Sequence, residues 1–161
     1  MQSKIDVLSK QVPEPSLGGQ GGPIAIIKYN AGNVQSVQYA LQRIGVTSLV
    51  TDDAETIQKA GKVIFPGVGH AAPAMQYLKE RGLDEIILNL KQPVLGICLG
   101  MQLMCRSSEE GSMPGLGWID ADVKRFAISA DSDLKVPHMG WNTLKLQIGR
   151  ASCRERVLQV V

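Results

Sequence analysis

The chain has 161 residues, a length that suits one globular domain. Hydrophobic residues make up 44% of it, which excludes a disordered protein, and the sequence has no apolar run that predicts a membrane span. The net charge is only +2, and acidic and basic residues balance within 23–147, which argues against binding to nucleic acid or to an anionic membrane. Three cysteines without framework spacing indicate a reducing compartment, so we expect a cytoplasmic protein.

The two ends differ in composition from the middle of the chain. Residues 1–22 end in PEPSLGGQGG, which predicts a linker or a disordered leader. Residues 148–161 include IGRASCRERV, which looks like a translated cloning adapter and predicts a non-native tail; a natural basic helix is the alternative. The folded domain is therefore expected at 23–147, and we expect it to be incomplete at its C-terminus.

Apolar runs that are typical of buried strands alternate with helical patterns from residue 23 onward. Strands are predicted at 24–27, 48–51, 62–65 and 94–97. Asn33 is expected to cap the first helix, which ends before Gly45, and Asp52 with Glu55 is expected to form a capping box for the second. Further helices are predicted at 71–81, 83–91 and from Cys98 to about Ser107.

This alternation predicts an α/β fold with a doubly wound parallel sheet. The pattern changes after Gly117, where residues 118–126 and 134–147 are predicted to be strands of a small antiparallel flap.

The strongest chemical signal is the segment Gly96-Ile97-Cys98-Leu99-Gly100, which lies between a predicted strand and a predicted helix. It is the cysteine version of the nucleophile elbow, whose tight turn exposes the nucleophile and requires small residues two positions to either side. The N–H of Leu99 is expected to bind a developing oxyanion. A buried core cysteine is the alternative for Cys98. Cys105, within the apolar helix pattern, is predicted to be a packing residue.

Pro66-Gly67-Val68-Gly69 breaks the third predicted strand. Glycines at a strand end let the backbone approach a ligand, so the segment is a candidate for the second half of an oxyanion hole. A plain turn remains possible. So does a dinucleotide loop, because Gly67, Gly69 and Ala72 match G-x-G-x-x-A.

Several segments together resemble a known family: FPGVG (65–69), GICLGMQL (96–103), SSEEG (107–111) and VPHMGWN (136–142). They are similar to class I, triad-type glutamine amidotransferases, and within that family to the glutaminase subunits of imidazole glycerol phosphate synthases. VPHMGWN and YNAGN (29–33) are the more specific signatures. The resemblance covers about 23–147 and implies a doubly wound sheet of that type. No metal or organic cofactor is expected, because acyl transfer needs only a nucleophile, a base and oxyanion donors.

The resemblance implies a role for individual residues. Cys98 matches the nucleophile that forms a glutamyl thioester, and Val68 and Gly69 match the oxyanion strand. The residues that match or adjoin substrate-binding positions are Gly67, Gln102 and Glu110. The loop expected to face a partner is formed by His138, Met139, Gly140, Trp141 and Asn142. The implied partner is a (β/α)₈-barrel cyclase subunit, which forms a heterodimer with the glutaminase and receives its ammonia.

The family's triad histidine and glutamate have no counterpart in the sequence up to Gln147. Its two histidines, His70 and His138, do not match the catalytic position. We therefore expect the intact protein to be a glutaminase and this chain to be catalytically incomplete. Two alternatives remain: an amidotransferase domain of another synthase, and a non-catalytic binding or regulatory module on the same fold.

Overall fold

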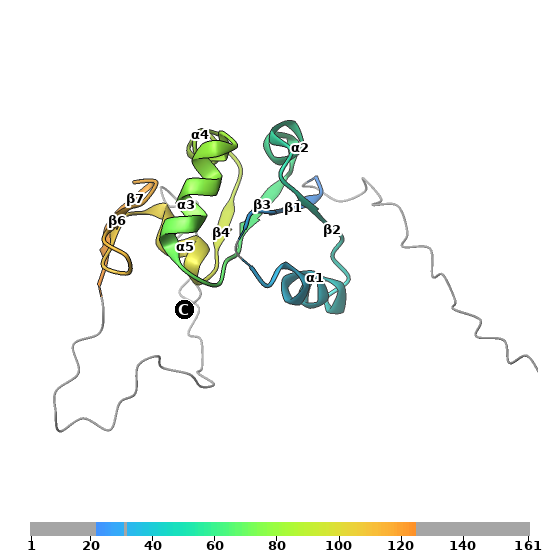
Figure 1. Ribbon diagram of the computed structural model, residues 1–161. Coiled ribbons are helices and arrows are strands. Elements are labelled where there is room, and N and C mark those ends of the chain that lie inside the picture. Colours follow the sequence, from blue (N-terminus) through green and yellow to red (C-terminus); the bar gives the residue numbers. More distant parts are fainter. Residues whose placement is uncertain (1–21, 31, 125–161) are drawn as a thin grey trace, which may run out of the picture.

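The computed structural model describes residues 22–30 and 32–124, whose arrangement is shown in Figure 1. The predicted leader, apart from Gly22, lies outside these residues. So do the predicted strand 134–147, the loop 138–142 and the tail 148–161.

Four parallel strands form the main sheet, in the order β2-β1-β3-β4. They are β1 (Ile24–Ile27), β2 (Ser48–Thr51), β3 (Lys62–Phe65) and β4 (Val94–Gly96). Each matches its predicted range to within one residue. The apolar runs form strands because both faces of the sheet are covered, and most of the side chains of β1 and β3 are buried.

Helices connect these strands and lie on both faces of the sheet (Figure 1). They are α1 (Val34–Arg43), α2 (Ala54–Lys59), α3 (Ala71–Glu80), α4 (Leu83–Leu88) and α5 (Leu99–Met104). The larger core cluster joins one face of the sheet to α2, α3, α4 and α5, whereas the smaller cluster joins the other face to α1. The predicted doubly wound α/β fold is therefore confirmed for the described residues.

The order of the strands places a topological switch point between β1 and β3. The chain runs outward from β1 to β2, then returns past β1 to form β3 and β4. In sheets of this kind, ligands bind outside the carboxyl ends of the strands at the switch point. The segments that follow β1 and β3 are therefore the expected place for a site.

The helix caps are partly as predicted. The Ser36 N–H donates to the side chain of Asn33 at 3.3 Å, as expected for a cap of α1. The cap of α2 is Asp53 rather than the predicted Asp52, because the carboxylate of Asp53 accepts the Thr56 N–H at 2.8 Å. Asp52 instead pairs with Arg81, which lies beyond the end of α3.

One prediction about the segment around α5 is wrong. The helix ends at Met104 instead of continuing to about Ser107, and Cys105–Ser108 forms strand β5. A second sheet has the order β6-β5-β7, with β6 at Met113–Pro114 and β7 at Ile119–Val123.

This second sheet is mixed, because β6 pairs antiparallel to β5 while β7 pairs parallel to it. The predicted antiparallel pairing of 118–126 with 134–147 stays a prediction, since 134–147 lies outside the described residues. The connection from β6 explains the direction of β7. Leu116 and Gly117 donate their N–H groups to the carbonyls of Leu103 and Cys105, which brings the chain back to the start of β5 before β7 begins.

Candidate active site

Cys98 lies between the end of β4 and the first residue of α5, as the elbow pattern predicted. Its backbone has φ 50° and ψ −115°, a conformation that non-glycine residues rarely adopt, and its side chain is exposed. Strained backbone of this kind costs on the order of 1–3 kcal/mol and persists only where the surrounding structure imposes it. The conformation is therefore a reason to look for function at this cysteine.

Two glycines that pack closely against neighbouring backbone impose this turn. A Cβ atom added to Gly100 would lie 1.8 Å from the carbonyl oxygen of Phe65 in β3, and one added to Gly96 would lie 2.8 Å from the Cα of Met101. Real Cβ contacts are essentially never shorter than 3.0 Å. The two glycines thus let α5 approach the sheet closely enough to hold Cys98 at the surface.

The segment Pro66–Gly69, here named the oxyanion turn after the role that the resemblance implies for it, lies directly beside this elbow. The Ile97 N–H donates to the Phe65 carbonyl at 3.0 Å, and the Leu99 N–H donates to the Gly67 carbonyl at 3.3 Å. Gly69 has φ +108°, which favours glycine, and the neighbouring Val68 is half exposed. The structure thus brings the oxyanion turn to Cys98, and it shows that the Leu99 N–H is bonded to Gly67 rather than free.

Tyr29 is part of this site, although the sequence analysis gave it no role. Its hydroxyl donates to the carbonyl of Pro66 at 2.5 Å, and its ring packs on Phe65 with 5.2 Å between the ring centroids. Burial raises the pKa of Tyr29, and the nearby charge of Cys98 raises it further. Its place in YNAGN (29–33), just after the strand predicted at 24–27, was the sequence signal that could have identified this residue.

Gln102 lies one turn after Cys98 on α5, and its N–H donates to the carbonyl of Cys98 at 3.0 Å. Its side-chain oxygen is buried without a hydrogen-bond partner among residues 22–30 and 32–124. Buried polar atoms nearly always have a partner, so this oxygen suits a ligand that donates a hydrogen bond.

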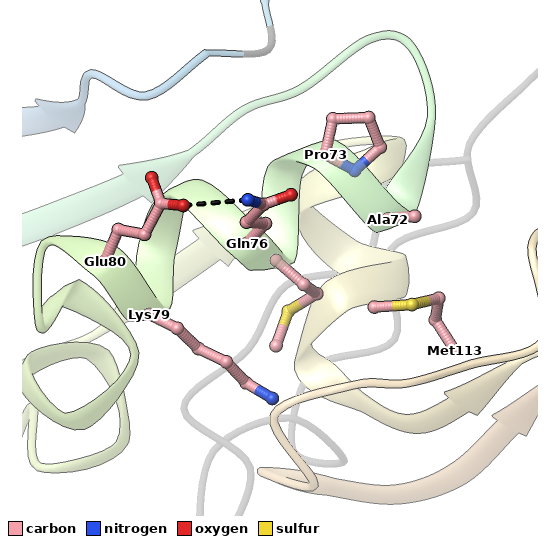
Figure 2. A pocket seen from close by; sticks show the side chains of 7 residues that line it. Ala72, Pro73, Gln76, Lys79, Glu80 and Met113 are labelled. Atoms are coloured by element: carbon pink, nitrogen blue, oxygen red, sulfur yellow. Dashed lines mark hydrogen bonds between the residues drawn. The ribbon is translucent and has the colours of Figure 1, made fainter.

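A hollow of about 450 Å³ lies between α3 and β6 (Figure 2). Its apolar part comes from Pro73, Met75 and Met113, and the side chains of Gln76 and Glu80 are hydrogen-bonded to each other at its edge. None of the predicted site residues lines it.

Glu110 lies in the turn between β5 and β6. Its carboxylate is 3.8 Å from Nδ1 of His70, the residue that follows the oxyanion turn. The Glu110 N–H donates to the hydroxyl of the buried Ser108 at 3.2 Å. The structure thus brings Glu110, from the second sheet, close to the oxyanion turn of the first.

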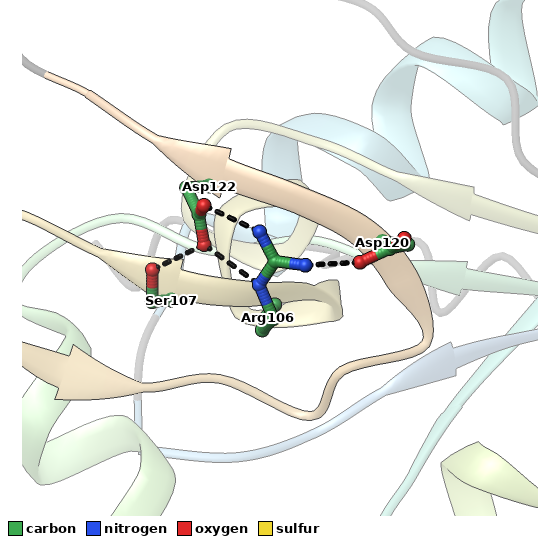
Figure 3. Close-up of polar contacts among 4 residues, drawn as sticks. All are labelled: Arg106, Ser107, Asp120 and Asp122. Atoms are coloured by element: carbon green, nitrogen blue, oxygen red, sulfur yellow. Dashed lines mark hydrogen bonds and ion pairs between the residues drawn. The ribbon is translucent and has the colours of Figure 1, made fainter.

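An ionic cluster joins β5, the strand that leads into the Glu110 turn, to β7 (Figure 3). Arg106 on β5 donates to both carboxylate oxygens of Asp122 on β7 and also to Asp120, and Ser107 donates to Asp122 at 2.6 Å. These hydrogen bonds, those of Arg106 first, lower the pKa of Asp122 to about 2. The cluster fixes β5 against β7 and so supports the Glu110 turn.

Cys105 is buried, and its thiol donates to the carbonyl of Met101 at 3.6 Å, which agrees with the predicted packing role. Burial raises the pKa of Cys105. In the described part of the chain, no cluster of three or more histidine, cysteine or acidic side chains could hold a metal ion. Within the same residues, every helix is too short or too polar to cross a membrane.

Comparison with known proteins gives a family from the sequence and a similar fold from a solved structure. Residues 25–155 match the family model described as glutamine amidotransferase class-I. A solved structure entitled "Crystal structure of glutamine amidotransferase" superimposes with a TM-score of 0.55 and 19% identity, covering 63% of this chain and 55% of that one. This likeness supports the fold alone.

Curated relatives carry the name "Imidazole glycerol phosphate synthase subunit HisH". The protein from Bacteroides thetaiotaomicron is 61% identical over 121 residues, which are 75% of this chain and 61% of the relative. The protein from Idiomarina loihiensis is 50% identical over 122 residues, 76% of this chain and 61% of the relative. The chain therefore spans about three fifths of the length of these relatives, and it belongs to the class-I glutamine amidotransferase family.

Proposed function

We propose that this chain carries the nucleophile and the substrate-binding residues of a glutaminase subunit, which releases ammonia from glutamine for imidazole glycerol phosphate synthesis in histidine biosynthesis. The observation that carries the proposal is the exposed Cys98, held at positive φ between β4 and α5. A nucleophile on a strained strand-to-helix turn is typical of enzymes that transfer acyl groups. The names of the curated relatives support the choice of pathway.

In the proposed reaction, the sulfur of Cys98 attacks the carboxamide carbon of glutamine. The C–N bond then breaks, and ammonia leaves with the proton that the thiol has given up. A glutamyl thioester remains on Cys98. Water attacks its carbonyl carbon, the C–S bond breaks, and glutamate and the free thiol are released.

The backbone N–H groups of Val68, Gly69 and Leu99 are the proposed oxyanion donors. Donors aimed at the developing charge are worth about 10²–10³ in rate each. The Leu99 N–H donates to Gly67 at 3.3 Å, a long hydrogen bond, and must leave it to reach the oxyanion. The proposed mechanism therefore includes the breaking of this one hydrogen bond, between Leu99 and Gly67, before or during attack.

Gly67, Gln102 and Glu110 are the proposed contacts for the rest of the substrate. The carboxylate of Glu110 suits the α-ammonium group of glutamine, and its position beside His70 places it next to the oxyanion turn. The unpartnered side-chain oxygen of Gln102 suits a second N–H donor of the substrate. Gly67 is proposed to contact the substrate through its backbone alone, because a Cβ atom there would lie 2.1 Å from the Tyr29 hydroxyl oxygen.

The proposed base is a histidine that a glutamate orients, and both belong to the full-length protein. By full-length protein we mean the product of the parent gene read past the codon for Gln147. We further propose that residues 1–22 are a leader and that 148–161 are non-native. The proposed partner is a (β/α)₈-barrel cyclase subunit, bound as a heterodimer through His138–Asn142 in the cytoplasm. If the gene encodes no histidine followed shortly by an acidic residue after Gln147, this mechanism fails.

The test uses the full-length protein and a chloroketone analogue of glutamine. We expect the analogue to label Cys98, free glutamine to slow the labelling, and Cys98→Ser to abolish both labelling and glutamine hydrolysis. Cys105→Ser is the matched control, because this thiol is buried and packs against α5. Hydrolysis that survives in Cys98→Ser would contradict the proposed function.

A further inference from the structure

The oxyanion turn continues the hydrogen-bond pattern of β3 after the strand has ended. Successive carbonyls of a strand point to opposite sides. Those of Phe65 and Gly67 accept N–H groups from the β4 side, namely those of Ile97 and Leu99. The carbonyl between them, that of Pro66, is bonded on the opposite side. Its partner must therefore come from the segment after β1.

Strand β1 offers no backbone donor at this level, because its pairing with β3 ends at Ile26 and Ile64. The hydroxyl of Tyr29 takes the place of that donor and bonds Pro66 at 2.5 Å. We propose that Tyr29 is a positioning residue for glutamine hydrolysis: its hydroxyl fixes the Pro66 carbonyl and so holds the oxyanion turn against the Cys98 elbow.

The packing around the hydroxyl supports this role. A Cβ atom added to Gly67 would lie 2.1 Å from the Tyr29 oxygen, so the backbone of the turn passes directly over the phenol. Tyr29 is only 7% exposed, and its ring is packed on Phe65. A substrate at Cys98 therefore has little of Tyr29 to contact, and the hydroxyl acts through the turn.

This inference rests on the proposed function, and it predicts that loss of the Tyr29 hydroxyl changes kcat and KM to different extents. The Pro66 carbonyl directly precedes Gly67, whose own carbonyl holds the Leu99 N–H. Loss of the Tyr29 hydroxyl leaves the Pro66 carbonyl without its donor and loosens the turn that supplies oxyanion donors. Because oxyanion donors act mainly in the transition state, kcat falls and the KM for glutamine does not.

The decisive variant is Tyr29→Phe in the full-length protein, assayed in complex with its synthase partner. We expect kcat for glutamine hydrolysis to fall about threefold to tenfold, the range that one hydrogen bond is worth, with KM changed less than about twofold. Alkylation of Cys98 by iodoacetamide needs no oxyanion donor, so its rate should stay within about twofold of the wild type. Tyr39→Phe is the matched control, because it removes an exposed hydroxyl on α1 that is also hydrogen-bonded.

An unchanged or increased kcat in Tyr29→Phe overturns the inference. So does a fall in kcat that is matched by an equal fall in the iodoacetamide rate in a variant that still unfolds cooperatively, which indicates a structural role only. If Tyr29→Phe does not fold, Gly67→Ala takes its place, since the new methyl group displaces the same hydroxyl; wild-type kcat in that variant also overturns the inference.

The failure of the proposed function gives a different result. In that case the wild-type protein does not hydrolyse glutamine, or Cys98→Ser hydrolyses it as well as the wild type. If the wild type is active, Cys98→Ser is inactive and Tyr29→Phe has the wild-type kcat, then only the positioning role of Tyr29 fails.

Discussion

Replacement of Gly100 by alanine tests whether the close approach of α5 to β3 sets the position of Cys98. The new Cβ would lie 1.8 Å from the carbonyl oxygen of Phe65, and this distance has to grow to at least 3.0 Å. Neither side yields easily, since the Phe65 oxygen belongs to the backbone of a strand that is paired on both edges. Overpacking costs about 1–3 kcal/mol, and we expect the upper end of that range because backbone has to move.

The same displacement moves Cys98, which lies two residues before Gly100, relative to the oxyanion turn. A misplacement of about 1 Å costs roughly 100-fold in rate. For Gly100→Ala in the full-length protein, we therefore expect the free energy of unfolding to fall by about 3 kcal/mol and kcat for glutamine hydrolysis to fall roughly 100-fold.

Urea unfolding and release of glutamate are the two assays. Gly22→Ala is the matched control, because a Cβ at Gly22 has its nearest neighbour at 3.4 Å, an ordinary contact. Both quantities should stay near the wild-type values in this control. If Gly100→Ala is destabilised by less than about 0.5 kcal/mol, the range of a neutral surface substitution, and keeps its kcat, the packing argument is refuted.

Three further predictions concern the surroundings of the site. Glu110→Gln should raise the KM for glutamine roughly tenfold to a hundredfold, the value of a hydrogen bond to a charged group, and steady-state kinetics with an unchanged KM would contradict its proposed role. Asp53→Ala removes the cap of α2 and should lower the urea concentration at the midpoint of unfolding, and an unchanged midpoint would count against the cap. The pKa of Asp122 is lowered to about 2 from 3.8, so its pairing with Arg106 should stabilise the fold above about pH 4 and lose this effect as the pH falls toward 2. Acid unfolding of Asp122→Asn should lack that component, and a curve identical to the wild type would count against it.

The main sheet was predictable because its signals are local. Apolar runs such as Ile24–Ile27 are typical of strands that are buried on both faces. Asn33 is recognisable as a helix cap because its side chain accepts a backbone N–H only three residues further on. The parallel direction of β7 was not predictable in the same way. It depends on hydrogen bonds from Leu116 and Gly117 to carbonyls of an earlier segment, and these leave no pattern in the sequence.

The same contrast between local and long-range signals explains which features of the site could be predicted. The glycines at positions 96 and 100 mark the Cys98 elbow, since their spacing reflects local crowding. Tyr29 was missed because its partner is a backbone carbonyl 37 residues away, and any residue type at position 66 would present the same atom. The bond between Leu99 and Gly67 was missed for the same reason.

The proposed nucleophile and the proposed substrate-binding carboxylate belong to different sheets. Cys98 follows a strand of the four-stranded sheet, whereas Glu110 is carried by a turn of the three-stranded one, which Arg106 and Asp122 clamp. Substitutions in the smaller sheet can therefore retune the glutamine concentration at which the enzyme half-saturates while its maximal turnover is preserved.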